Sequence, residues 1–219
     1  MTRFFLLLTL FALFIGLSYT VISLPQEAEG LGGLVNSEIQ NSGVSNPVTA
    51  VLMNFRAYDT FLEMAVLFVA LLGVYSLNTS ESHSKLFLQS SVLKRLGAVL
   101  IPILILLSAY LLWVGAHAPG GAFQAGSVLS ALFILIFLSG WKLYFSPKNW
   151  IVQLFLVASL LTFLTVCVVS LFISGKLLEL PQEYATFIIF ILEALATLSI
   201  GITLFNLFVS TFSQSKDKS

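Results

Sequence analysis

Residues 150–173 read WIVQLFLVASLLTFLTVCVVSLFI, a run of 24 residues that contains no charged side chain. An α-helix rises 1.5 Å per residue, so about 20 apolar residues are enough to cross the hydrocarbon core of a bilayer, which is about 30 Å thick. This stretch is therefore predicted to be a transmembrane helix.

Apolar runs of similar length recur along the rest of the chain, over residues 4–23, 48–77, 96–113, 121–138 and 184–212. Of the 219 residues, 58% are hydrophobic and 9% are charged, and the mean hydropathy is +1.01. Such a chain has too little polar surface to cover a water-soluble globule. The sequence predicts an all-α integral membrane protein with about six transmembrane helices.

The first apolar run, residues 4–23, has two interpretations. It follows Arg3 and could be a secretory signal peptide, which has a basic start and an apolar middle. However, the run is long for a signal peptide, and the possible cleavage positions near Thr20 and Ser23 lack an Ala-x-Ala pattern. We therefore expect a retained helix, with a cleaved signal peptide as the alternative.

The distribution of basic residues predicts the orientation of the chain. The sizeable loop over residues 24–47 carries Glu27, Glu29 and Glu38 but no Lys or Arg, and Lys176 is the only basic residue on the same predicted side. Cytoplasmic connections are enriched in Lys and Arg, so both termini are predicted to face the cytoplasm. Nearly all the basic residues then lie on the cytoplasmic side: Arg3, Lys85, Lys94, Arg95, Lys142, Lys148, Lys216 and Lys218.

Three charged residues lie inside an apolar helical pattern. At 100° per residue on one continuous helix, Asp59 is about 60° and Glu63 about 20° from Arg56, so all three share a face. A charge at membrane depth costs several kcal/mol unless it is paired or hydrated. The three residues are candidates for an ion or proton path. Alternatively, Arg56 and Asp59 form an ion pair at the membrane interface and dock this helix against a neighbour.

Glu193 is a carboxylate in the last apolar run, with no basic residue within one helical turn. Because burial disfavours the charged form, it is expected to be neutral, or to exchange protons where water reaches it. It is a further ion-path candidate. The alternative is a protonated side chain that donates a hydrogen bond to a neighbouring helix.

Residues 115–126 read GAHAPGGAFQAG and join two of the predicted helices. Pro119 suits the start of a helix, and the small residues around it allow another segment to approach closely. His117 is the last ion-path candidate, because histidine is a side chain suited to proton transfer. Alternatively, the segment is a tight turn whose histidine faces water.

Other functions are excluded by composition. The net charge is zero, there is no phosphate-binding glycine loop, and Cys167 has no Cys or His at metal-ligand spacing. No catalytic triad or carboxylate pair can be assembled from these residues. The chain is therefore expected to have no catalytic residues, no metal, no cofactor and no nucleic-acid partner.

The motif Gly115-x-His117-x-Pro119-Gly120-Gly121-x-Phe123-Gln124-Ala125-Gly126 resembles the signature of the B-type component (MnhB) of Mrp-type sodium/proton antiporters. The resemblance covers residues 94–212. Ala122 stands where that family often has a third glycine.

Residues 46–68, NPVTAVLMNFRAYDTFLEMAVLF, are similar to a module at the carboxyl end of the large A-type component of the same antiporters. The small E-type component of membrane-bound hydrogenases carries the same module. The two resemblances together imply a fusion, with a two-helix module over residues 1–90 and a four-helix MnhB-like domain over residues 91–219.

The resemblance implies a multi-pass subunit of a hetero-oligomeric complex in a bacterial or archaeal cell membrane, which exchanges sodium or another monovalent cation for protons. Three hypotheses for its role stay open. The chain is a subunit that lines the ion path, a subunit that serves assembly only, or a subunit of a redox-driven ion pump related to complex I. Glu193 lies outside the motif. The residues that the resemblance marks are Arg56, Asp59, Glu63, His117, Pro119, Gly120, Gly121, Phe123, Gln124 and Gly126.

Overall fold

The computed structural model describes residues 2–24, 30–77, 91–141, 149–175, 177–178 and 180–214. This part of the chain forms two compact units, Met1–Asn36 and Ser37–Ser219. Several residues used to predict the orientation lie outside the described ranges: Glu27, Glu29, Lys85, Lys142, Lys148, Lys176, Lys216 and Lys218.

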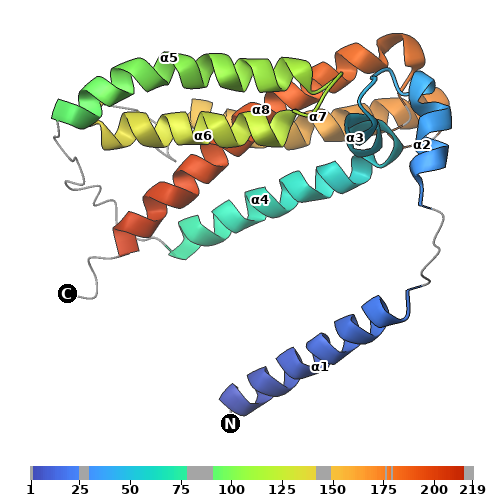
Figure 1. The fold of residues 1–219 in the computed structure, drawn as a ribbon, viewed down its shortest axis with the longest axis horizontal. Coiled ribbons are helices and arrows are strands. Elements are labelled where there is room, and N and C mark those ends of the chain that lie inside the picture. The colour runs from blue at the N-terminus through green and yellow to red at the C-terminus, as the bar shows by residue number, and fades with distance from the viewer. Residues whose placement is uncertain are drawn as a thin grey trace. The chain divides into compact units, whose positions relative to one another are not determined.

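The secondary structure of the described residues is helical throughout (Figure 1). The first unit holds α1 (Thr2–Ile22), and α2 (Gly32–Glu38) crosses the boundary between the units. The second unit holds η1 (Ile39–Asn41), α3 (Pro47–Ala50), the π-helix η2 (Val51–Phe55), α4 (Ala57–Leu77), α5 (Ser91–Val114), α6 (Ala122–Leu138), α7 (Trp150–Ser174) and α8 (Gln182–Gln214).

Five of these helices, α1, α4, α5, α7 and α8, are long and apolar enough to cross a membrane. The remaining predicted segment, residues 121–138, forms α6, which has 17 residues and stands at the short end of the transmembrane range. The prediction of an all-helical membrane protein is confirmed. Six crossings, the retention of α1, cytoplasmic termini and a domain boundary at residue 90 stay predictions.

The predicted helix over residues 48–77 is wrong as a continuous element. Asn46 caps α3 through its side chain, with Pro47 in the first turn, and the backbone then passes through one π-helical segment. Arg56 breaks the helix, with φ −131° and ψ 35°. The Thr60 hydroxyl donates a hydrogen bond of 2.7 Å to the Leu52 carbonyl oxygen, which lies on the other side of the break. Arg56 therefore lies outside α4, and the premise of one continuous helix face fails there.

The predicted loop over residues 24–47 contains two short helical elements, α2 and η1, and its position outside the membrane stays a prediction. The Ser42 hydroxyl accepts a hydrogen bond from the Val44 backbone N–H, and its own O–H lies close to the Ile39 and Val44 carbonyl oxygens. The side chain of Asn54 donates to the Ser42 carbonyl at 2.9 Å. These contacts hold the end of the segment against η2.

The long helix α8 forms the centre of the second unit and contacts α4, α6 and α7. Figure 1 shows α5 and α6 side by side, with α8 crossing them obliquely. Ile189, Leu192 and Ile200 of α8 are buried in the core. A side-chain carbon placed on Gly126 of α6 would lie 2.8 Å from Ile200, so α6 and α8 approach as closely as glycine allows.

Candidate functional site

An open groove of about 840 Å³ lies between η2, α4, the first turn of α6 and α8; we call it the polar groove. Its walls include Thr49, Met53 and Thr60. Three stretches that are far apart in the sequence, residues 48–67, 120–124 and 193–196, contribute side chains to its lining. The polar groove is lined by eight of the residues that the sequence singled out: Arg56, Asp59, Glu63, Gly120, Gly121, Phe123, Gln124 and Glu193.

Arg56 and Asp59 form an ion pair of 2.5 Å between Nη2 and Oδ2, across the break that precedes α4. Asp59 also lies in the first turn of α4, where the helix dipole favours a negative charge. The two side chains are 59% and 41% exposed. The structure thus shows the ion pair that the docking alternative required, although the residues also line the polar groove.

Glu63 follows Asp59 by one turn of α4 and also lines the polar groove. Its side chain is exposed, and none of the described residues forms a hydrogen bond or ion pair with it. Among the described residues of the lining, Arg56 is the only positively charged one, against three carboxylates. With all three carboxylates ionised, the lining carries net negative charge, which raises the local concentration of cations.

Glu193 lines the polar groove from α8, yet only 4% of its surface is exposed. Within the described ranges, its carboxylate has no hydrogen-bond or ion-pair partner, so the predicted hydrogen bond to a neighbouring helix is absent there. A side-chain carbon built on Gly121 would stand 3.0 Å from Glu193 Oε1 and 3.8 Å from Gln124 Oε1. The carboxylate therefore sits directly against Gly121.

Gly121 is suited to this place for two reasons. Its φ of +105° lies in the region that L-residues with a side chain rarely adopt, and a side chain there would crowd the Glu193 carboxylate. It is also the residue that precedes α6, and it offers no side chain to cap the helix. The unpaired N–H groups of the first turn carry partial positive charge, so they favour a carboxylate nearby.

His117 and Pro119 lie outside the polar groove, and so does Gly126, which packs against α8. His117 is exposed, and its Nδ1 lies 3.1 Å from the Ser45 hydroxyl. Pro119 was expected at the start of a helix, but α6 begins at Ala122. Residues 115–121 instead form a tight turn, in which the Gly121 N–H donates to the Leu111 carbonyl at 2.9 Å.

Two residues that hold this turn were missed by sequence analysis. Asn46 Nδ2 donates to the carbonyl oxygens of Gly115 at 3.0 Å and Ala118 at 2.9 Å. Thr49 donates to the Gly115 carbonyl as well, at 2.6 Å. The Asn-Pro pair at residue 46 signals a helix start, but nothing in the sequence pairs it with residue 115.

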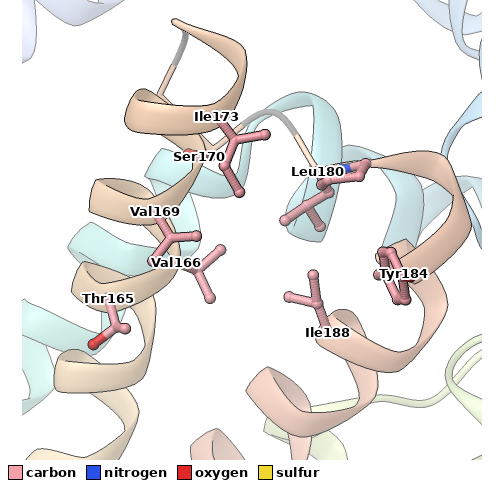
Figure 2. A pocket seen from close by; sticks show the side chains of 9 residues that line it. Thr165, Val166, Val169, Ser170, Ile173, Leu180, Tyr184 and Ile188 are labelled. Carbon is pink, nitrogen blue, oxygen red and sulfur yellow. The ribbon is translucent and has the colours of Figure 1, made fainter.

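A second cavity, of about 220 Å³, lies between α7 and α8 and has a different character (Figure 2). The described residues that line it include no charged side chain, and the Ser170 hydroxyl already accepts a hydrogen bond from the Leu178 N–H. No charged group among these residues marks an ion site. The lining consists of Thr165, Val166, Val169, Ser170, Ile173, Leu180, Pro181, Tyr184 and Ile188.

In the described part of the chain, no three His, Cys, Asp or Glu side chains lie close enough together to hold a metal ion. Cys167 is a free cysteine.

Comparison with known proteins identifies the family of this chain. Residues 92–212, more than half of the chain, match the family described as a domain related to the MnhB subunit of Na+/H+ antiporters. The chain belongs to this family. Residues 4–104 of this MnhB-related chain match a second family, MbhE, which is described as the E-type component of MBH. Both resemblances inferred from the motifs are thereby confirmed.

A curated relative is the A/B component of a probable K(+)/H(+) antiporter from Rhizobium meliloti (strain 1021), which is 28% identical over 176 residues. The match covers 65% of the MnhB-related chain but only 18% of the relative, so the chain spans less than a fifth of that protein's length.

Two solved structures share the fold of the MnhB-related chain. The Mrp complex from Dietzia sp. DQ12-45-1b contains a chain with a TM-score of 0.68 and 22% identity, and the match covers 98% of this chain and 26% of that one. An archaeal respiratory membrane complex, the membrane-bound sulfane sulfur reductase, contains a chain with a TM-score of 0.67 and 20% identity. In that second match the coverage is 96% of this chain and 97% of the other. The MnhB-related chain thus has the fold of subunits from multisubunit membrane complexes.

Proposed function

We propose that this multi-pass membrane protein is a subunit of a complex that exchanges sodium, or another monovalent cation, for protons, and that its polar groove lies on the route of the ions. The strongest support is that candidate residues from both matched family regions line the same groove. Arg56, Asp59 and Glu63 come from one matched family region, whereas Gly121 and Glu193 come from the other.

The cost of charge in a membrane also supports a hydrated groove. A charged side chain at membrane depth costs several kcal/mol unless it faces a partner or water. Asp59 has a partner in Arg56, but Glu63 and Glu193 have none within the described residues, and both face an open groove. We infer that water fills the groove and hydrates these carboxylates in the assembled complex.

A purely structural role is the competing proposal for the same residues. In that case the ion pair at the α4 break and the packing around Gly121 serve assembly alone. Replacing a groove carboxylate by its amide then leaves exchange intact whenever the complex assembles.

The two proposals are separated by sodium-dependent proton exchange in inverted vesicles that carry the whole complex, with wild type compared to Glu63→Gln at matched complex abundance. We expect exchange to be lost while assembly stays normal. Glu183→Gln is the matched control, because Glu183 is an exposed carboxylate on α8 outside the polar groove. Unchanged exchange in Glu63→Gln would remove the groove from the ion route.

A second function is favoured by the match to the MbhE family over residues 4–104 and by the fold shared with a chain of the sulfane sulfur reductase. In such a complex, ion transfer through the same groove would be driven by electron transfer. The redox cofactors would lie in other subunits. Iron–sulfur or nickel subunits that copurify with this chain would identify that setting, whereas exchange by a complex without them would identify a stand-alone antiporter.

We further propose that the chain crosses the membrane six times with both termini in the cytoplasm. The support is the length of the five long helices, the apolar character of α6, and the basic pair Lys94 and Arg95 in the first turns of α5. Fusion of a fluorescent reporter to each end tests this, because a reporter that folds only in the cytoplasm then fluoresces at both ends.

A further inference from the structure

Glu193 combines two properties that rarely occur together in a structural side chain. It is 4% exposed, and the described part of the chain gives its carboxylate no hydrogen-bond or ion-pair partner, yet it lines an open groove. Buried carboxylates are almost always hydrogen-bonded or paired, because removing the charge from water is costly. A buried acid that faces a groove without a partner is therefore a place for a ligand that enters through the groove.

The atoms around the carboxylate define the chemistry of that ligand. Gln124 Oε1 lies beside the same face of Gly121 as Glu193 Oε1. Carboxylate and amide oxygens are hard ligands, and they suit small hard cations better than metals that prefer nitrogen or sulfur.

The other charged side chains that line the groove are exposed, so the buried site itself carries only the one negative charge of Glu193. They are Arg56, Asp59 and Glu63, and the only cation among them is already paired with Asp59. The neighbouring face of α6 contributes Gly121, Ala122, Phe123 and Gln124, none of which is charged. One monovalent cation, or one proton, neutralises Glu193 and leaves the buried site without net charge.

We propose that Glu193 is a binding site for which a proton and a small alkali-metal cation compete, with Gln124 as a neutral oxygen ligand. This inference rests on the proposed function of the polar groove. The exchange is balanced: the cation binds the ionised carboxylate, and the proton that leaves the carboxyl oxygen passes to water in the groove. Gly121 keeps the space between the two side chains open because it has no side chain of its own.

The test is chemical labelling of the wild-type complex in membranes with dicyclohexylcarbodiimide, which reacts with carboxyl groups in their protonated form. The labelled peptide is identified by mass spectrometry, with choline chloride replaced stepwise by sodium chloride or potassium chloride at constant ionic strength. We expect Glu193 to be labelled in choline and to lose labelling as the alkali cation is added. The sodium and potassium series show which cation binds.

Two variants make the result specific. Gln124→Met keeps the length of the side chain but removes the oxygen, so protection of Glu193 should require a higher cation concentration. Glu183→Gln, on the exposed first turn of α8, should leave the labelling of Glu193 and its protection unchanged. Labelling of Glu193 that neither cation reduces, or an absence of labelling in choline, would overturn the proposal.

The outcomes also distinguish this site from the function on which it rests. If Glu63→Gln abolishes exchange but cations do not protect Glu193, the groove stays on the ion route and the Glu193 site is wrong. If cations protect Glu193 but Glu63→Gln exchanges normally, the site stands and the proposed route through the groove is wrong.

Discussion

Asn46 donates a hydrogen bond of 3.0 Å from its side-chain nitrogen to the carbonyl oxygen of Gly115, a residue 69 positions further along the chain. The same nitrogen reaches the Ala118 carbonyl, and the side-chain oxygen of Asn46 accepts from the Val48 N–H. One buried amide thus starts the α3–η2 segment and fixes the turn that leads to Gly121. The relative placement of the two walls of the polar groove depends on it.

Asn46→Ala is therefore expected to destabilise the second unit by about 2 kcal/mol, because it removes a helix cap, takes one of two donors from the Gly115 carbonyl and removes the side-chain donor of the partly buried Ala118 carbonyl. Thermal unfolding of the detergent-solubilised complex measures this. Asn149→Ala is the control, since Asn149 caps α7 in the same way through Ile151 but is only partly buried. Equal losses in both variants would show that Asn46 acts only as a cap.

Gly121→Ala is expected to reduce exchange and stability together. The added carbon would stand 3.0 Å from Glu193 Oε1, and the backbone conformation of this residue, with φ 105° and ψ −174°, costs a side-chain-bearing residue about 1–3 kcal/mol. Exchange in vesicles and the unfolding temperature report the two effects. Gly73→Ala on α4 is the matched control, because a carbon there meets no atom within 4 Å. Normal exchange in Gly121→Ala would show that the space beside Glu193 has no role.

Asp59→Asn is expected to impair exchange while leaving the fold stable. The Arg56–Asp59 pair is about half exposed, and exposed ion pairs contribute only about 0–1 kcal/mol to stability. The amide keeps the shape of the side chain and removes its charge. Parallel measurement of complex abundance, unfolding temperature and exchange separates the two roles. If the complex fails to assemble in Asp59→Asn, the ion pair is chiefly a docking element.

The helices were predictable because length and apolarity alone determine which segments cross a bilayer. The predicted limits 150–173 agree closely with α7, Trp150–Ser174, because Asn149 and Trp150 mark its start and Gly175 its end. The break at Arg56 was not predictable, since residues 48–77 are apolar almost throughout and a π-helical turn leaves no periodic signal.

Each candidate residue could be predicted from the sequence, but the sequence did not predict that these residues line one groove. Glu63 and Glu193 stood out because a carboxylate in an apolar run is costly. That they line the same groove depends on the packing of α4 and α6 against α8, which no local pattern contains. Asn46 and Thr49 escaped notice because uncharged polar side chains near a helix start are common.

The most direct test of the polar groove as an ion route blocks it in a complex that is already assembled and active. In a Cys167→Ser background, Val66→Cys places a thiol in the groove lining, and Val69→Cys places one on the same helix outside that lining. The two valines are matched, because they are 67% and 64% exposed. Proton exchange is measured before and after treatment with a positively charged methanethiosulfonate reagent, and the extent of modification is measured by mass spectrometry.

If ions pass through the groove, modification of Val66→Cys stops exchange, reduction of the mixed disulfide restores it, and equally modified Val69→Cys exchanges normally. Undiminished exchange by fully modified Val66→Cys would contradict the role of the groove.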